Sequence, residues 1–347
     1  MNSGVVNLAI IGVGNMGLLH LRKVKELEKK LKCRVTAIIE PDESRVRYLK
    51  RELPKKRDFK FLNHLGELDS LSEEDKVHAA ILAVPAKMNV QMTAACLKKK
   101  IHCLVEKPLG FSAMDCRDLE RKATKNNCFL QVGMLERWAM CRLWGDWRPK
   151  LSEGPWSLSC VRKGPYLPRV ADTDVIHDLM IHDIDLFVLL KTVFDLPKIK
   201  KIRAWGRKMR SETLDHAVAD FEFEDLSRMR FYSSRLSTTS SRNWELTGPG
   251  WHATLDYLNR EFLCFEEVKA GRKNFRARRK SWKNGDPLGL EIEAFVQRIR
   301  GKFNQSTSAH NIFKRFGDDP MKMLPSADTV IDTHKIIDRI LSQIKVL

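Results

Sequence analysis

Two histidines and four aspartates lie within thirteen positions of the segment DVIHDLMIHDIDL, residues 174–186, among Val, Ile, Leu and Met. If this segment is helical, Asp178 and His182 are four residues apart and share one face. A carboxylate beside an imidazole can hold the ring in one tautomer and raise its basicity. The pair therefore predicts an acid–base site that could take the proton from a hydroxyl group.

Two other interpretations of this segment stay open. His177, Asp178, His182 and Asp183 are residue types that bind metals, but residues 177 and 182 do not share a helical face and no second acidic cluster completes such a site. The polar side chains could instead cap a helix and form salt bridges, which would make their role structural. We prefer the acid–base pair and predict no metal site.

A phosphate-binding pattern lies near the N-terminus. The motif AIIGVGNMG, residues 9–17, places G-x-G-x-x-G directly after an apolar run and at the start of a helical pattern. The first glycine permits a tight turn, the second lets the backbone approach a pyrophosphate, and the third allows close helix–strand packing. The helix N-terminus then favours the phosphates. We expect a dinucleotide to contact Gly12, Gly14, Asn15, Met16 and Gly17.

The acid that ends the next apolar run indicates which dinucleotide is bound. Glu40 lies 23 residues beyond Gly17, close to the spacing of a carboxylate that bonds the adenosine ribose hydroxyls. A carboxylate there repels a 2′-phosphate, and Pro41 and Asp42 follow it rather than arginine. The sequence therefore favours NAD over NADP as the cofactor.

A third motif, VEKPLG at residues 105–110, ends another apolar run. Side chains at the carboxyl edge of a parallel sheet project into the ligand crevice. Lys107 at that edge would put an ammonium group beside the nicotinamide, where it could hold a substrate oxygen. A surface ion pair is the alternative interpretation of this motif.

The elements that must position these residues fall into two patterns. The first 130 residues alternate apolar runs with amphipathic stretches, which predicts a doubly wound parallel sheet. After about residue 134, strand-like runs follow one another with turn signals between them, which predicts a mainly antiparallel sheet. We predict an α/β fold plus an α+β fold, with an NAD-binding Rossmann domain over residues 1–133. An open-sheet substrate and oligomerisation domain follows over residues 134–347, and its C-terminal helices could pack back on the first domain.

The composition narrows the class of protein. No apolar run in the 347 residues is long enough to cross a bilayer, the first residues do not have the pattern of a signal peptide, and the eight cysteines include no C-x-x-C pair. These features predict a cytoplasmic protein without a membrane span. The net charge is +18, and much of the basic excess is scattered along the chain; its densest cluster is GRKNFRARRKSWK, residues 271–283. We interpret this segment as a solvated loop or edge strand and expect no nucleic-acid partner.

The three motifs AIIGVGNMG, IHCLVEKPLG and HDLMIHDIDL, in that order and spacing, resemble the glucose–fructose oxidoreductase / inositol dehydrogenase / rhizopine catabolism (Gfo/Idh/MocA) family. The resemblance implies a nicotinamide-dependent oxidation or reduction of a sugar or cyclitol carbon. It makes Lys107 the lysine of the Glu-Lys-Pro motif and Asp178 and His182 the acid–histidine pair. The further cofactor contacts that we expect are Ala83, Pro85, Asn89, Glu106 and Lys107. The family often has His at the position of Asn89 and Gly at the position of Lys100.

A narrower resemblance, to UDP-N-acetylglucosamine 3-dehydrogenases within that family, is carried by residues 132–138 and 161–186. This chain has Trp138-Ala139-Met140 where those enzymes tend to have Phe-Asn-Pro. The resemblance implies NAD-dependent oxidation of the C3 hydroxyl of UDP-N-acetylglucosamine to a 3-keto sugar. The residues expected to contact that substrate are Lys107, Arg137, Arg162, Tyr166, Arg169 and His182.

The narrower resemblance also implies partners. A pyridoxal-phosphate aminotransferase would convert the 3-keto group to an amine on the way to lipid A or a surface polysaccharide, and the second sheet would pair in a homodimer or homotetramer. Two alternatives stay open. The chain could be a dehydrogenase of the same family that acts on another sugar, a UDP-hexuronic acid or inositol. It could also be a non-catalytic NAD-sensing protein that binds nucleic acid or a protein partner.

Overall fold

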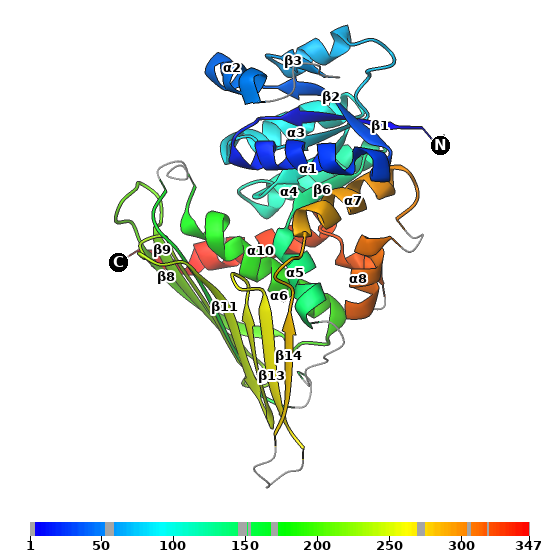
Figure 1. Ribbon diagram of the computed structural model, residues 1–347. Coiled ribbons are helices and arrows are strands. Elements are labelled where there is room, and N and C mark those ends of the chain that lie inside the picture. Colours follow the sequence, from blue (N-terminus) through cyan, green and yellow to red (C-terminus); the bar gives the residue numbers. More distant parts are fainter. Residues whose placement is uncertain are drawn as a thin grey trace. The chain divides into compact units, whose positions relative to one another are not determined.

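The apolar runs of the first 135 residues form the strands of one sheet, and those of the middle of the chain form another. A computed structural model describes residues 4–52, 59–144, 151, 154–167, 173–268, 275–303, 307–317 and 319–346 (Figure 1). The chain divides into two units. Unit 1 consists of Met1–Leu135, Asp286–Asn311 and Leu324–Ile331, and unit 2 consists of Glu136–Gly285, Ile312–Met323 and Asp332–Leu347.

Unit 1 is built on six parallel strands in the order β3-β2-β1-β4-β5-β6. The order reverses direction beside β1, as in dinucleotide-binding sheets, and ligands bind at that point outside the carboxyl ends of the strands. The continuous apolar runs are buried on both faces, as parallel strands require. The strands are β1 (Val6–Ile11), β2 (Cys33–Ile39), β3 (Lys60–Leu62), β4 (Ala79–Leu82), β5 (His102–Glu106) and β6 (Leu130–Gly133).

Helices between the strands cover this sheet. Helix α7, which comes much later in the chain, joins them, because its Ile292, Phe295 and Val296 share one core cluster with Leu21 and Val24 of α1. The helices are α1 (Asn15–Leu31), α2 (Glu43–Glu52), α3 (Asn89–Lys98), α4 (Ala113–Lys125) and α7 (Pro287–Ile299), with 3-10 turns η1 (Leu65–Ser70) and η2 (Ala86–Met88).

Unit 2 contains a nine-stranded sheet in the order β14-β13-β12-β11-β7-β10-β9-β8-β15. Its strand pairs are antiparallel except β10 with β7 and β15 with β8. The strands are β7 (Ser157–Lys163), β8 (Ile199–Arg207), β9 (His216–Phe223), β10 (Arg228–Ser234), β11 (Ser241–Gly248), β12 (Trp251–Asp256), β13 (Glu261–Glu267), β14 (Phe275–Ser281) and β15 (Ile344–Val346).

Burial alternates along these strands, so one face of the sheet is covered and the other is open. On the covered face, Phe187 contacts the rings of Phe223 and Phe231, and Trp144 stacks on Phe262. Phe187 lies on α6 (Ile181–Val193), which continues a π-helical turn η4 (Ile176–Met180), and Trp144 lies on α5 (Leu135–Trp144). The remaining helices are α8 (Ser308–Phe316), α9 (Pro320–Met323) and α10 (Ala327–Gln343).

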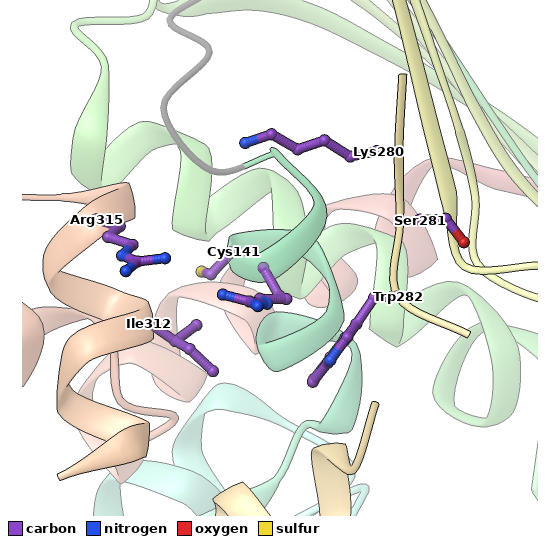
Figure 2. A pocket seen from close by; sticks show the side chains of 7 residues that line it. Cys141, Lys280, Ser281, Trp282, Ile312 and Arg315 are labelled. Atoms are coloured by element: carbon purple, nitrogen blue, oxygen red, sulfur yellow. The ribbon is translucent and has the colours of Figure 1, made fainter. Parts of the chain in front are cut away.

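A pocket of about 330 Å³ lies within unit 2 where α5, β14 and α8 meet (Figure 2). Its charged lining consists of Arg142, Lys280 and Arg315, and Trp282 forms part of the wall. We call it the basic pocket.

The predicted fold class is confirmed, since a Rossmann sheet is followed by a mainly antiparallel sheet. The basic segment ends in an edge strand, because β14 is the outermost strand of its sheet; residues 271–274 of that segment lie outside the described residues. Within the described part of the chain, the helices are too short or too polar to cross a membrane.

Candidate active site

The glycine loop of unit 1 has the geometry that a pyrophosphate requires. Gly12 has a φ of 79°, and a Cβ on it would lie 2.7 Å from the carbonyl oxygen of Ala83. A Cβ on Gly17 would lie 2.0 Å from the carbonyl oxygen of Gly12. Around Gly14, by contrast, a Cβ would meet nothing within 4 Å, and this residue directly precedes α1. The open backbone at a helix N-terminus fits a dinucleotide phosphate.

Glu40 follows β2 and is bonded to the same loop. Its Oε2 accepts a hydrogen bond of 3.0 Å from the Val13 N–H, and its Oε1 accepts one of 3.1 Å from the Asp42 N–H. Arg45, which the sequence analysis did not single out, donates from Nε to the Val13 carbonyl oxygen at 2.8 Å. A guanidinium therefore lies on the glycine loop together with the predicted ribose carboxylate.

The residues after β4 lie at the same edge of the sheet. Ala83 donates its N–H to the carbonyl oxygen of Ile11 at 2.8 Å and is half-buried, and Pro85 is exposed. Because β1, β4 and β5 are parallel neighbours, their carboxyl ends bring the glycine loop, residues 83–85 and Lys107 to one edge.

Lys107 lies directly after β5, in a turn that Asn89 holds from behind. The Asn89 side-chain amide donates to the carbonyl oxygens of Glu106 at 3.0 Å and Pro108 at 2.7 Å. Asn89 is 0% exposed, so in this structure its side chain faces the turn rather than a ligand. We expected it to contact the cofactor; the geometry makes it a clamp on the turn, while Lys107 itself stays half-buried.

A buried acidic group lies behind the same turn. Glu106 pairs with the ring of His20 on α1, at 2.7 Å between Oε1 and Nε2. Burial raises the pKa of the Glu291 carboxyl well above its ordinary value, and the negative charge of Glu106 raises it further, against a small opposing effect of the Met134 N–H. Glu291 on α7 is 0% exposed. Burial and the charge of Glu106 therefore favour the protonated form of this carboxyl, beside the Glu-Lys-Pro motif.

In unit 2 the predicted catalytic pair lies where η4 passes into α6. Asp178 is in η4 and His182 is in α6, and both side chains are half-buried. The π-helical turn changes the spacing that a regular helix would give these residues. Their partial exposure leaves both side chains accessible to a ligand.

The structure shows a carboxylate–imidazole pair between Asp174 and His177, in the same segment. Oδ2 of Asp174 lies 2.7 Å from Nδ1 of His177, and Oδ1 accepts the N–H groups of Ile176 at 2.9 Å and His177 at 3.0 Å. Although burial alone would raise the pKa of Asp174, the bonds from His177 and these N–H groups hold it below its ordinary value. His177 is only 2% exposed. This pair therefore caps the helix from inside.

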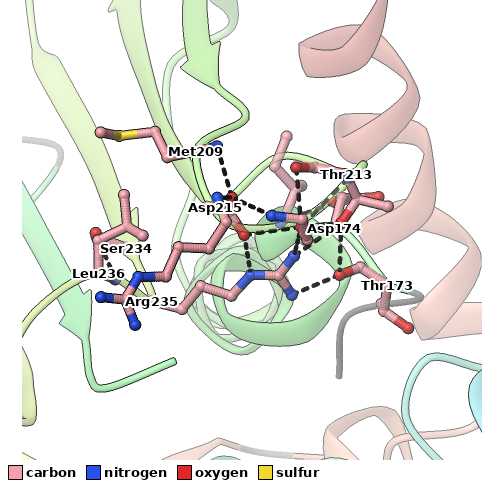
Figure 3. Close-up of polar contacts among 11 residues, drawn as sticks. Thr173, Asp174, Met209, Thr213, Asp215, Ser234, Arg235 and Leu236 are labelled. Carbon is pink, nitrogen blue, oxygen red and sulfur yellow. Dashed lines mark hydrogen bonds and ion pairs between the residues drawn. The ribbon is translucent and has the colours of Figure 1, made fainter. Parts of the chain in front are cut away.

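A polar network fixes the residue that precedes this cap (Figure 3). The guanidinium of Arg235 donates to the Thr173 carbonyl oxygen at 2.7 Å and to Oδ1 of Asp215 at 2.8 Å. Burial opposes ionisation of Asp215, yet the N–H groups of Arg210 and Met209 and the Arg235 guanidinium hold its pKa below the ordinary value. The network anchors the start of the helical segment that carries Asp178 and His182.

Two of the expected substrate residues form ion pairs with buried aspartates inside unit 2. Arg137 makes a two-pronged pair with Asp185, at 2.7 and 2.6 Å, and Arg162 makes one with Asp183, at 2.9 and 3.1 Å. Arg137 and Arg162 are each 1% exposed, so these guanidiniums offer no accessible donor to a phosphate. The structure corrects the expectation that they bind the substrate: they hold α5 and β7 against α6.

Tyr166 and Arg169 were also expected to contact the substrate. Tyr166 is half-buried, and its ring lies 5.6 Å from the Arg235 guanidinium carbon. Arg169 lies outside the described residues. Among the residues that the structure does describe, no group of three or more His, Cys, Asp or Glu could hold a metal ion.

Comparison with known proteins shows similarity to oxidoreductases. Residues 6–134 match the model of the oxidoreductase family, NAD-binding Rossmann fold (GFO_IDH_MocA). The chain is 25% identical over 297 residues to UDP-N-acetylglucosamine 3-dehydrogenase of Acidithiobacillus ferrooxidans, which covers 84% of this chain and 87% of that protein. It is 24% identical over 201 residues to scyllo-inositol 2-dehydrogenase (NADP(+)) IolW of Bacillus subtilis, 54% of each chain.

Solved structures share the whole fold. The structure of UDP-N-acetylglucosamine 3-dehydrogenase GnnA from Acidithiobacillus ferrooxidans matches with a TM-score of 0.74 over 97% of both chains, at 19% identity. Together with the open glycine loop, the family match confirms the NAD-binding Rossmann domain. Residues 6–134 therefore form an NAD-binding Rossmann domain of the kind that the oxidoreductase family model GFO_IDH_MocA describes.

Proposed function

We propose that this protein is an NAD-dependent sugar dehydrogenase that oxidises the C3 hydroxyl of a UDP-N-acetylhexosamine, UDP-N-acetylglucosamine first, to a 3-keto nucleotide sugar. The observation that carries the proposal is the common edge of β1, β4 and β5. That edge holds the glycine loop and, two strands away, Lys107 in a turn clamped by Asn89. The nucleotide sugar is supported by the 25% identical relative, which is a UDP-N-acetylglucosamine 3-dehydrogenase.

The residues present fit a bound dinucleotide. The N–H groups at the start of α1 would take the pyrophosphate, and Glu40 would accept hydrogen bonds from the adenosine ribose. When bound, NAD supplies the acceptor for the hydride that leaves the alcohol carbon.

The proton chemistry falls to three side chains. His182 takes the proton of the C3 hydroxyl, Asp178 orients the imidazole and stabilises its charged form, and the Lys107 ammonium holds the reacting oxygen. Lys107 belongs to unit 1, and Asp178 and His182 belong to unit 2.

The sugar nucleotide needs binding groups besides these. Arg137 and Arg162 are each 1% exposed, so we do not include them among the proposed substrate contacts. Tyr166 and Arg169, which lie between β7 and η4, stay in the proposal as substrate contacts. The anchoring of Thr173 by Arg235 would fix the far end of this segment.

The product sets the reaction that follows. A 3-keto nucleotide sugar is a substrate for a pyridoxal-phosphate aminotransferase, and we propose amination at C3 in lipid A or surface polysaccharide synthesis as the next step. The cytoplasm, where nucleotide sugars are made, is the proposed location. A homodimer or homotetramer is the proposed assembly, formed through the open face of the nine-stranded sheet.

A second substrate class has support of its own. Inositol 2-dehydrogenases match about half of this chain, and the NADP-dependent relative IolW is 24% identical over 201 residues. Oxidation of a free cyclitol would use the same Lys107 and His182 but no nucleotide contacts. The two candidates therefore differ in whether UDP competes with the substrate.

The test is NADH absorbance with NAD⁺ and a panel of UDP-N-acetylglucosamine, UDP-N-acetylglucosaminuronic acid, UDP-glucose, myo-inositol and glucose. A carbonyl trap in each reaction removes the ketone, because the equilibrium could lie towards the alcohol. The proposal expects the highest kcat/KM with UDP-N-acetylglucosamine and competitive inhibition by UDP. A higher kcat/KM for inositol or glucose without inhibition by UDP would replace the nucleotide sugar. NAD⁺ binding without turnover of any alcohol would favour the sensor.

A further inference from the structure

The basic pocket of unit 2 takes no part in the proposed reaction. Its charged and aromatic lining comes from the last turn of α5, the end of β14 and the last turn of α8, whereas Asp178 and His182 lie on η4 and α6. The volume of about 330 Å³ is within the range of small-molecule sites. It also contains the end of the basic segment, 271–283, to which neither the fold nor the reaction gives a role.

The strand register directs Lys280 into this pocket. In the antiparallel pair β13–β14, Lys280 lies opposite Phe262, which is buried on the covered face of the sheet against Trp144. Residues directly opposite each other share a face. Figure 2 shows Lys280 reaching over the end of α5.

The neighbouring cations of β14 are already paired. Arg278 pairs with Glu266 at 3.2 Å, and Arg279 pairs with Glu261 at 3.0 Å. Lys283 lies 3.5 Å from the same Glu261. Among the described residues that line the basic pocket none is acidic, so the charge of Lys280 is not neutralised by them.

The two arginines add to this positive charge. Arg142 and Arg315 are exposed in the last turns of α5 and α8, and in Figure 2 Arg315 points from α8 towards Cys141. A helix end carries about half a negative charge. The partial charges of the two helix ends lie beside the arginines, whereas Lys280 lies on a strand, so the charge of Lys280 makes the pocket attract anions.

The wall that Trp282 provides is fixed in place. A Cβ on Gly285 would lie 2.1 Å from the indole ring, so the ring packs closely on this glycine. The backbone N–H of Trp282 donates to the Arg260 carbonyl oxygen at 3.0 Å, and the backbone N–H of Gly285 donates to the Trp282 carbonyl oxygen at 3.0 Å. An indole held on one side offers a planar surface for stacking at low entropic cost.

We propose that the basic pocket binds a nucleoside phosphate, with the base against Trp282 and the phosphates between Lys280, Arg142 and Arg315. None of the described residues that line it belongs to the glycine loop, η4 or α6. A planar ring beside three cations suits this class better than inorganic phosphate, which would leave the indole without a partner.

The test is isothermal titration calorimetry of the full chain with ADP, at saturating NAD⁺ so that the dinucleotide site is closed to the adenine. The proposal expects one ADP site per chain. Lys280→Gln should weaken ADP binding about tenfold or more, the loss of a hydrogen bond to a charged group. Trp282→Leu should weaken it about tenfold through the lost stacking.

Two controls separate the pocket from general surface charge and from the catalytic site. Arg276→Gln removes the same charge from β14 but does not line the pocket, and it should change ADP affinity less than twofold. Tyr166→Ala, at a proposed contact of the sugar nucleotide, should also leave the ADP affinity unchanged. Circular dichroism spectra and Tm values check that each variant is folded.

The proposal is overturned if NAD-saturated protein binds no ADP, or if Arg276→Gln weakens binding as much as Lys280→Gln. Pyrophosphate binding as tightly as ADP, with no effect of Trp282→Leu, would overturn the nucleoside part of it. Loss of ADP binding in Tyr166→Ala would assign the ligand to the substrate site. Because the titration measures no turnover, its outcome is independent of whether the dehydrogenase assignment holds.

Discussion

The side-chain amide of Asn89 spans the peptide groups around Lys107. It donates to the carbonyl oxygens of Glu106 and Pro108, which precede and follow the lysine, at 3.0 and 2.7 Å. The catalytic ammonium proposed here is therefore placed by a residue that is itself fully buried.

Replacing Asn89 should impair catalysis more than cofactor binding. Asn89→Ala removes both donors and leaves two carbonyl oxygens without them, a cost of about 1–3 kcal/mol each when buried. We expect kcat to fall about tenfold or more, while the Kd for NAD⁺ changes less than about threefold. Stopped-flow turnover and fluorescence titration give the two numbers. A Kd that rises as much as kcat falls would return Asn89 to the direct cofactor contacts.

Glu40 should set the preference for NAD over NADP. Its carboxylate repels a 2′-phosphate, and Arg45 lies on the same glycine loop through its bond to the Val13 carbonyl oxygen. Glu40→Ala should lower the ratio of kcat/KM for NAD⁺ to that for NADP⁺ about tenfold or more. The gain in NADP⁺ use should disappear in the double variant Glu40→Ala/Arg45→Gln. An unchanged ratio in Glu40→Ala would mean that another group selects the cofactor.

The buried Glu291 should make stability fall as the pH rises. Burial and the charge of Glu106 raise its pKa well above the ordinary 4.5, so the folded protein keeps a proton that the unfolded chain releases. The stability due to this protonated group is complete below the unfolded pKa and is lost as the pH rises through the folded pKa. The loss is about 1.4 kcal/mol per pH unit within that window.

Glu291→Gln removes this loss. The free energy of unfolding of the variant, measured in urea between pH 5 and 8, should therefore increase relative to the wild type as the pH rises. Glu43→Gln, on the exposed α2, serves as the control for an amide substitution. Parallel pH profiles of Glu291→Gln and the wild type would contradict the protonated carboxyl.

Removing one partner of the buried pair Arg137–Asp185 should lower the free energy of unfolding more than replacing both partners by apolar residues. Asp185→Asn leaves a guanidinium that is 1% exposed without its counter-charge, which should cost about 3–5 kcal/mol of unfolding free energy. The double variant Arg137→Met/Asp185→Leu should recover most of that loss. The exposed pair Lys76–Glu73 is the control, and Lys76→Ala should change stability by less than about 1 kcal/mol. Equal losses at the buried and exposed pairs would contradict this account.

The glycine loop was predictable because its signal is local. Gly12, Gly14 and Gly17 all lie between the end of β1 and the first turn of α1. Neighbouring backbone atoms require Gly12 and Gly17, whereas Gly14 leaves the backbone open to a phosphate. The two sheets were predictable because their signals are also local: apolar runs that alternate with helical stretches in unit 1, and apolar runs separated by turns in unit 2. Arg45 was missed, since it is five residues beyond Glu40 and only the fold of α2 brings it to Val13.

The aspartate-rich segment shows what a local pattern cannot decide. Asp174, Asp183 and Asp185 all face partners inside unit 2, and only the folded chain shows that Arg162 and Arg137 reach two of them. Arg162 is 21 positions from Asp183 and Arg137 is 48 positions from Asp185, so the spacing carried no signal of either pair. The π-helical turn at 176–180 also has no mark in the composition of the segment.

The central claim is that Lys107 and His182 act on the substrate hydroxyl, and single-turnover hydride transfer tests it most directly. Enzyme saturated with NAD⁺ is mixed with UDP-N-acetylglucosamine, and NADH absorbance is followed for Lys107→Ala, His182→Ala and the buried neighbour variant His177→Asn. The account predicts that the first two variants bind NAD⁺ but transfer hydride at a rate that is lower than the wild-type rate by about 100-fold or more. His177→Asn, once shown to be folded, should transfer hydride within about threefold of the wild-type rate. Wild-type rates in both Lys107→Ala and His182→Ala would contradict the account.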